Sequence, residues 1–88
     1  MAVRVLYFAW LREKAGRGEE SLDLPAPVRD VSALIEWLRG RGGGPADALS
    51  DLRAVRVAVN QEYVSFAFPV ADGDEVAFFP PVTGGGCR

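Results

Sequence analysis

The residues with the clearest chemical potential stand near the C-terminal end, where two prolines precede a run of glycines. Pro80 and Pro81 fix their own φ angles and stiffen the chain. The glycines at 84–86 carry no side chain and adopt nearly any backbone angle. A stiff base with a thin, pliable tip is suited to threading a narrow channel and presenting a carboxylate to another protein's active site. The alternative is an ordinary frayed terminus, and composition alone does not decide between the two.

Elsewhere the chain lacks the side chains that catalysis usually requires. Histidine is absent, which removes the most common general base and metal ligand, and lysine occurs once, as Lys14. The segment Asp72-Gly73-Asp74 is far shorter than a calcium loop and is typical of a tight turn. The single cysteine, Cys87, has only Arg88 as a neighbouring cation, so we expect an ordinary exposed thiol. We therefore expect neither an enzyme acting alone nor a metal or cofactor bound by this chain.

Length, charge and hydropathy set further limits. A chain of 88 residues forms one domain with one modest core, because at this size about 60% of the unfolded surface is buried. The 10 basic and 12 acidic side chains give a net charge of -2, so nucleic acid is not an expected partner. No apolar run approaches the ~18 residues of a membrane span, and the first residues lack the layout of a signal peptide. We expect a cytoplasmic protein that does not contact a membrane.

The elements that support the glycine run begin with a hairpin. Alternating apolar side chains predict a first strand over residues 3–9 and a second over residues 19–24, paired with each other. Residues 10–15 are good helix formers and are followed by Gly16, which is typical of a helix end. The sequence therefore predicts a loose hairpin with a short helix in its connection.

The main helix is predicted to begin after Asp30, which caps it, and to close at Arg39-Gly40. Trp37 lies off the apolar face of this helix, and we expect it to pack at the flank. The run Gly42-Gly43-Gly44 lacks the Lys-Ser/Thr of a phosphate loop and predicts a flexible connector, followed by a weak helical signal over residues 46–52. The predicted core face of the helix, at i, i+3, i+4 and i+7, consists of Val31, Leu34, Ile35 and Leu38.

The second half of the chain predicts three further strands. Residues 55–59 alternate, with the valines inward and Ala58 outward, and a turn at Asn60-Gln61 leads into a strand over residues 63–66. The last strand covers residues 75–79 and stops at the prolines. Strands separated by helical segments in this way predict an α+β fold, with one principal helix on one face of a sheet.

Two adjacent phenylalanines end the last strand. Successive side chains of a strand point to opposite faces, so only one of Phe78 and Phe79 lies in the core. The other either belongs to a docking surface beside the glycine run, since aromatic residues are enriched in interfaces, or is covered by a loop or the Trp10 region. Arg12 and Arg56 are candidates for polar contacts at the rim of such a surface, unless they are simply solvated.

Three segments together resemble a known family. They are V-L-Y-F-A-W-L-R-E-K-A-G at 5–16, V-A-V-N-Q-E-Y-V at 57–64 and D-G-D-E-V-A-F-F-P-P-V-T-G-G at 72–85. Over nearly its whole length the chain resembles the small subunits of molybdopterin synthase, and the last segment is the most specific. The resemblance implies a β-grasp, ubiquitin-like domain over residues 1–81, with a mixed sheet of four to five strands and one main helix on one face. It also implies a flexible C-terminal glycine tail over residues 82–88.

The resemblance further implies a sulfur carrier. An E1-like adenylating enzyme uses ATP and magnesium to activate the carboxylate of the terminal glycine, which becomes a thiocarboxylate. The large synthase subunit holds the tail while the sulfur passes to precursor Z, also called cyclic pyranopterin monophosphate, and builds the dithiolene of molybdopterin. By motif, Gly85 matches the family's terminal glycine and Gly84 is the second member of the pair. The positions that the resemblance assigns to partner binding are Phe78, Phe79, Pro80, Pro81, Val82 and Thr83.

The sequence departs from the family pattern after Gly85, where Gly86-Cys87-Arg88 follow. With these residues attached, no glycine carboxylate is free to be activated. Three interpretations stay open: a processing protease removes the extension, the extension is tolerated, or the chain is a relative that is never activated. The alternative functions are a sulfur carrier for thiamine or cysteine synthesis, and a ubiquitin-like binding module or protein modifier.

Overall fold

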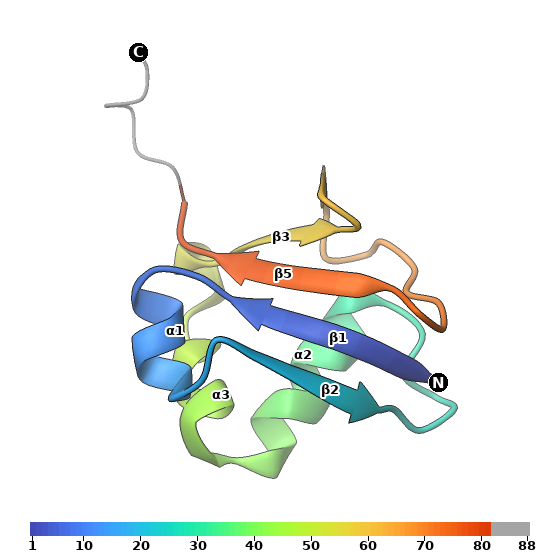
Figure 1. Cartoon of the computed structure of the whole chain (residues 1–88), viewed down its shortest axis with the longest axis horizontal. Helices are drawn as coiled ribbons and strands as arrows, with labels where there is room; N and C mark the ends of the chain where they lie inside the picture. The colour runs from blue at the N-terminus through green and yellow to red at the C-terminus, as the bar shows by residue number, and fades with distance from the viewer. Residues whose placement is uncertain (82–88) are drawn as a thin grey trace.

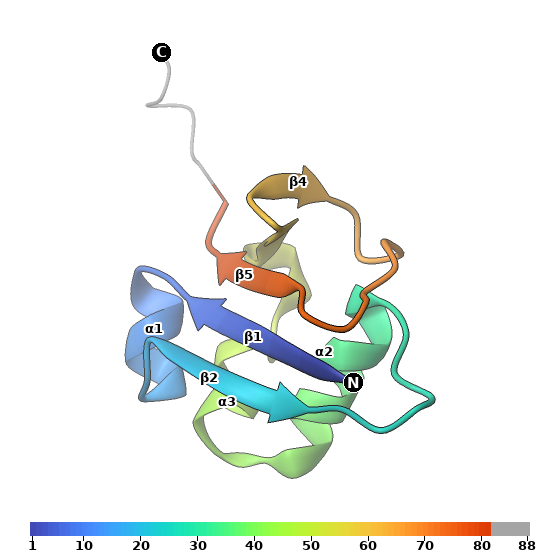
Figure 2. The same ribbon diagram turned by 45° about the vertical axis from the view of Figure 1, so that its right-hand side comes forward.

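A computed structural model describes residues 1–81 of the chain. Its centre is a five-stranded mixed sheet in the order β2-β1-β5-β3-β4, and the principal helix α2 lies behind the sheet in Figures 1 and 2. The elements are β1 (Ala2–Tyr7), α1 (Trp10–Ala15), β2 (Glu19–Asp23), α2 (Val31–Arg41), α3 (Gly43–Ala48), a 3-10 turn η1 (Leu52–Ala54), β3 (Arg56–Val59), β4 (Glu62–Val64) and β5 (Glu75–Phe79).

The central strands β1 and β5 run parallel, whereas the pairs β1–β2, β3–β5 and β3–β4 are antiparallel. In the parallel pair Tyr7 is aligned with Phe78, and the Phe8 amide donates to the Phe78 carbonyl oxygen at 3.0 Å. The C-terminal ends of both strands therefore lie at the same end of the sheet. There β1 leads into α1 and β5 leads into Pro80, while the N-terminus lies at the opposite end (Figure 1).

The core forms between the sheet and α2, as the helical periodicity predicts. Asp30 caps the helix, since its Oδ1 accepts a hydrogen bond from the Ala33 amide at 2.7 Å. Trp37 is half-buried and packs against the edge of the core, as expected. In residues 1–81 no helix has the length and apolar character needed to cross a membrane. The four predicted core positions of α2 are all buried: Val31, Leu34, Ile35 and Leu38.

The prediction of a flexible connector at residues 42–44 is wrong. The segment Gly43–Ala48 forms the helix α3, which packs against α1. Gly44 lies so close to α1 that a Cβ atom there would overlap the carbonyl oxygen of Ala15. Glycine is thus required at this position for close packing of two helices, and local sequence gives no sign of that contact.

Strand boundaries also differ from the predicted ones. β1 ends at Tyr7 because the backbone turns sharply at Ala9, which has φ 54° and ψ −136°. β4 covers Glu62–Val64 and stops short of residue 66, since the Phe68 amide donates to the Ser65 carbonyl in a turn. The second strand, the short helix with Gly16 at its end and the last strand have the predicted bounds to within one residue.

Candidate functional site

The two adjacent phenylalanines at the end of β5 occupy opposite faces, as predicted. The Phe78 side chain is fully buried in the core and stacks on Tyr7, with 6.2 Å between ring centroids. Phe79 lies on the outer, helix-free face and is half-buried. Of the two candidate partner contacts, only Phe79 is therefore on the surface. Phe78 instead anchors the C-terminal end of β5 in the core.

A tyrosine of the neighbouring hairpin, which the sequence reasoning missed, covers part of Phe79. The Tyr63 ring lies 5.3 Å from the Phe79 ring, centroid to centroid, at an interplanar angle of 36°. Tyr63 is opposite Ala58 in the β3–β4 pairing, and 78% of its surface is exposed. The tight turn at Asn60-Gln61 was the available signal, because it fixes which residue of β4 shares a face with Ala58.

These side chains enclose an apolar groove of about 310 Å³ on the outer face of the sheet. Ala58 and Ala77, which are register partners, form its floor. Ala58 faces outward from the core, as predicted, and is nevertheless buried because the surrounding side chains cover it. Phe8, Tyr63 and Phe79 form the walls, and polar side chains lie at the rim. We call the surface of Phe8, Ala58, Tyr63, Ala77 and Phe79 the outer groove.

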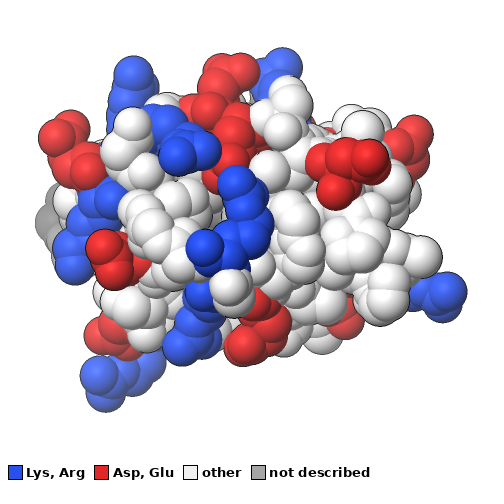
Figure 3. All heavy atoms as spheres, turned by 90° about the horizontal axis from the view of Figure 1, so that it is seen from below, with Lys and Arg blue, Asp and Glu red and all other residues white. Residues whose placement is uncertain are grey.

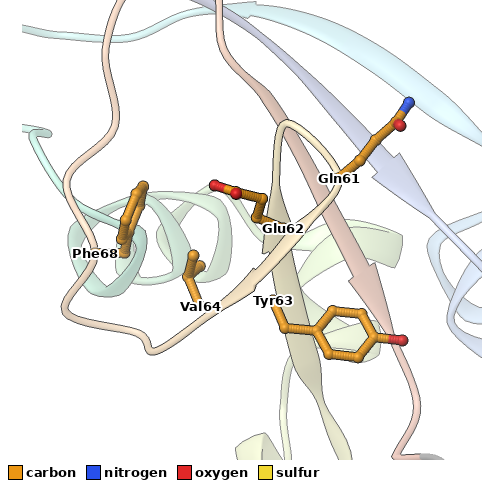
Figure 4. A pocket seen from close by; sticks show the side chains of 5 residues that line it. All are labelled: Gln61, Glu62, Tyr63, Val64 and Phe68. Atoms are coloured by element: carbon orange, nitrogen blue, oxygen red, sulfur yellow. The ribbon is translucent and has the colours of Figure 1, made fainter.

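A second hollow lies on the other side of β4. In Figure 4, Val64 and Phe68 face each other between β4 and the following loop, and Tyr63 points away from them, toward the outer groove. Tyr63 therefore lies at the boundary between the two hollows and lines both of them. Phe68 is 37% exposed and provides a comparison aromatic that lies outside the outer groove.

The last residues that the structure describes lie directly beyond the outer groove. Pro80 and Pro81 follow Phe79 and are half-buried. Because their rings fix φ, they hold the direction in which the chain leaves the sheet. The remaining predicted site residues, Val82, Thr83, Gly84 and Gly85, lie outside the described residues, as does the tail over 82–88 as a whole.

The start of β5 is fastened to the hairpin that carries Tyr63. The Asn60 side chain donates to Asp74 Oδ1 at 3.0 Å and accepts from the Glu75 amide at 3.1 Å. Asp74 Oδ2 also accepts from the Ala71 amide at 2.8 Å, and Gly73 has φ 88°, so the predicted tight turn is confirmed. The Asp74 carboxylate is therefore engaged in holding the turn. Within residues 1–81 no group of three or more acidic, histidine or cysteine side chains is placed to hold a metal ion.

A polar cluster supports the end of β1 from the core side. The Tyr7 hydroxyl donates to Glu20 Oε2 at 2.8 Å, and the same carboxylate lies 3.1 Å from Arg17 and 3.6 Å from Arg41. Burial, together with the hydrogen bond to Glu20, raises the pKa of Tyr7 far above its ordinary value. The phenol therefore stays protonated and acts as a donor that joins β1 to β2, next to the strand end that carries Phe8.

Charged side chains are not grouped by sign on the face that Figure 3 shows, whereas apolar side chains gather in the outer groove. Figure 3, which views the molecule from below, shows Lys/Arg and Asp/Glu side chains intermixed on that face, with no field of a single sign. Arg56, a predicted rim residue, is exposed at the start of β3 and donates to the carbonyl oxygens of Arg53 and Val55. The outer groove itself is lined mainly by aromatic and aliphatic side chains, with Gln61 and Glu75 beside them.

The sheet order and the single principal helix define a ubiquitin-like β-grasp domain, in agreement with solved structures. A putative molybdopterin converting factor subunit 1 from Pyrococcus furiosus has a TM-score of 0.75 at 37% identity, covering 93% of this chain and 99% of that chain. SAMP1 from Haloferax volcanii has a TM-score of 0.74 at 27% identity, covering 96% and 99%. The expected fold class is confirmed.

Sequence comparison gives the family. The ThiS family matches residues 5–85, so the match ends at Gly85. The molybdopterin synthase sulfur carrier subunit of Escherichia coli (strain K12) is 45% identical over 83 residues, covering 94% of this chain and 99% of the relative. That of Homo sapiens is 35% identical over 88 residues, covering 94% and 93%. The chain therefore belongs to the ThiS family and, within it, to the molybdopterin synthase small subunits that its sequence resembles.

Proposed function

We propose that this chain is the sulfur carrier subunit of a molybdopterin synthase and carries sulfur as a thiocarboxylate on Gly85. The observation that carries the proposal is the near full-length similarity to such subunits, with a family match that ends at Gly85. An apolar groove beside the strand that leads to this glycine supports the proposal, because it offers a surface on which a partner can dock. The domain itself supplies the binding surface and delivers the reacting group.

The proposed chemistry needs no acid or base from this chain. A Gly85 carboxylate oxygen attacks the α-phosphorus of ATP, pyrophosphate leaves, and an acyl-adenylate forms on an E1-like adenylating enzyme that supplies ATP and magnesium. A sulfur nucleophile then displaces AMP and leaves the thiocarboxylate. In the synthase the C–S bond breaks as sulfur passes to precursor Z, and oxygen from water restores the carboxylate. Glycine favours every acyl step because it has no side chain to obstruct the incoming atom.

The large synthase subunit is the proposed docking partner. Phe79 and Tyr63 are paired aromatics on an otherwise small-residue floor, which is the arrangement expected of anchors that fill a partner pocket. Pro80 and Pro81 connect this anchor to the residues that enter the partner's active site. Docking at the outer groove would thereby fix the position from which the tail extends.

The residues after Gly85 must be removed before activation. Adenylation requires a free carboxylate, and in the full sequence the Gly85 carbonyl is part of the peptide bond to Gly86. Hydrolysis of that bond by a processing protease releases Gly86-Cys87-Arg88 and frees the carboxylate. The same step would make the thiol of Cys87 irrelevant to the mature carrier.

Intact-mass spectrometry tests both the formation of a thiocarboxylate on Gly85 and the need to remove the residues after it. The full chain and a chain ending at Gly85 are incubated with the E1-like enzyme, ATP, magnesium and a sulfur donor. We expect only the shorter chain to gain the mass difference between sulfur and oxygen, and the full chain to gain it after a cell extract has trimmed it. A Gly85-ending chain whose mass never changes would overturn the proposal.

Genetic rescue separates the alternative carriers. A strain that lacks only its molybdopterin synthase carrier should regain molybdoenzyme activity when it expresses this chain. When strains that lack only the carrier for thiamine or for cysteine synthesis express this chain, they should still require the corresponding supplement for growth. Rescue of one of those strains alone, or lysine adducts in cell extract without thiocarboxylate, would favour the other carriers or a protein modifier.

A further inference from the structure

The corner between β1 and α1 contains an unusual backbone conformation. Ala9 has φ 54° and ψ −136°, a combination that residues with a side chain rarely adopt. The other non-glycine residues of residues 1–81 with positive φ are Asn60 and Gln61, which form a tight hairpin turn where such angles are normal. Ala9 has no such explanation, and strained residues of this kind concentrate at binding and catalytic sites.

The strained corner holds two large aromatic side chains in solvent. Phe8, before it, is 48% exposed and forms a wall of the outer groove. Trp10, after it, is 40% exposed and begins α1, whose buried residues are instead Leu11 and Ala15. Core packing therefore accounts for neither exposed ring.

Trp10 is also paired with the only lysine of the chain. The Lys14 Nζ lies 5.7 Å from the centroid of the Trp10 ring, one helical turn away. Lys14 is exposed, and no carboxylate of residues 1–81 forms an ion pair with it. An aromatic ring with an uncompensated cation beside it fits an apolar pocket that has a carboxylate at its rim.

This pair lies at the end of the sheet that any tail-binding partner must cover. Figures 1 and 2 place α1 at the same end as the exit of β5. The hydrogen bond from Phe8 to Phe78 joins the two exits directly. A stable interface takes roughly 20–30 residues on each side, whereas the outer groove together with Gln61 and Glu75 at its rim has only seven lining residues. The interface must extend beyond the groove, and α1 is the neighbouring exposed element at this end.

We propose that Trp10 and Lys14 form a second docking contact for the synthase large subunit, which would offer an apolar pocket for the indole and a carboxylate for the Lys14 ammonium. The inference rests on the proposed function and adds a specificity-determining contact to it. Ala9 acts as a positioning residue, since its conformation sets Phe8 and Trp10 on two sides of one corner so that both engage the same partner.

Calorimetric titration of the purified large subunit with the carrier tests the proposal. We expect Trp10→Ala to weaken binding about tenfold or more, as truncation of a buried aromatic anchor does. Lys14→Glu should weaken it several-fold, with a loss that shrinks at high salt. Phe68→Ala is the matched control and should bind like the wild type. Trp10→Gln, which keeps a side chain at the helix start, should repeat the loss, and thermal unfolding of each variant verifies its fold.

The outcomes distinguish this inference from the proposed function. If the wild type binds the large subunit and both Trp10 variants bind equally well, the second contact is wrong and the function stands. The second contact is also overturned if the Trp10 variants lose affinity only for the adenylating enzyme, or if Phe68→Ala loses as much affinity for the large subunit as they do. If the wild type does not bind the large subunit at all, the proposed function fails together with this inference.

Discussion

The Tyr63 ring leans across β3 onto the Phe79 ring, with 5.3 Å between the centroids, although β4 and β5 are not neighbours in the sheet. Ala58 of β3 lies opposite Tyr63, and its small side chain leaves the space in which the two rings meet. The contact joins the strand that leads to the tail with the edge hairpin. It therefore creates the outer groove from two segments far apart in sequence.

Replacing Tyr63 by alanine should separate binding from stability. The side chain is 78% exposed, so we expect the free energy of unfolding to fall by about 1 kcal/mol or less, the value of an aromatic pair. The affinity for the large subunit should fall at least tenfold, because a central aromatic anchor contributes about 2 kcal/mol. Urea unfolding and calorimetric titration measure the two quantities, with Phe68→Ala as control. A Tyr63→Ala carrier that binds normally would place the docking surface elsewhere.

Two glycine-to-alanine substitutions should have opposite effects on stability. At Gly44 a methyl group would overlap the Ala15 carbonyl, so we expect Gly44→Ala to lower the free energy of unfolding by about 1–3 kcal/mol. At Gly40, inside α2, no atom beyond the neighbouring backbone of the same helix lies within 4 Å of the added methyl. The alanine there should raise the free energy of unfolding by up to about 1 kcal/mol. Urea denaturation measures both. Equal effects at the two positions would contradict the close packing of α1 on α3.

The buried phenol of Tyr7 should make the protein sensitive to alkali. Its pKa is 10.0 in the unfolded chain and higher in the folded protein, mainly because burial disfavours the phenolate. Above pH 10 the unfolded state releases a proton that the folded state keeps. The free energy of unfolding is therefore undiminished below that pH and falls as pH rises, by up to about 1.4 kcal/mol per pH unit.

Urea titrations from about pH 8 to 11 check this, since they bracket the ordinary tyrosine pKa. Tyr7→Phe should lose about 1–2 kcal/mol near pH 8, because Glu20 loses a donor, and should lack the additional fall at high pH. The chain has two tyrosines, so Tyr63→Phe is the natural control and should keep the alkaline fall. Identical pH profiles for wild type and Tyr7→Phe would rule out the phenol as the cause.

Local patterns predicted the elements that depend on local interactions. The core face of α2 and its Asp30 cap follow from helical spacing and short-range hydrogen bonds, and the last strand follows from apolar residues bounded by turn residues and prolines. Only a weak helical signal over residues 46–52 pointed to the helix at Gly43–Ala48. Its glycine start was missed because it depends on contact with α1, a tertiary interaction that overrides poor helix propensity.

Local patterns likewise predicted some features of the candidate site and not others. Alternation along β5 correctly predicted that the two phenylalanines face opposite sides, but could not say which one is buried. The roles of Tyr63 and Ala58 depend on strand register across the hairpin, and that of Trp10 on the backbone angle at Ala9. Strand pairing and turn geometry determine these features, and residue types alone do not specify either. For Ala9 the residue type even argues against the conformation observed.

Replacing Ala9 by glycine should reveal the cost of the strained corner. Glycine adopts φ 54° and ψ −136° without steric cost, so we expect Ala9→Gly to raise the free energy of unfolding by up to about 1 kcal/mol, despite the greater entropy of the unfolded chain. Its affinity for the large subunit should fall several-fold, since Phe8 and Trp10 are no longer preorganised. Gly16→Ala, at φ 78° with open space around it, is the control and should lower stability by about 1 kcal/mol. An Ala9→Gly chain that is less stable than the wild type would show that the corner stores no strain.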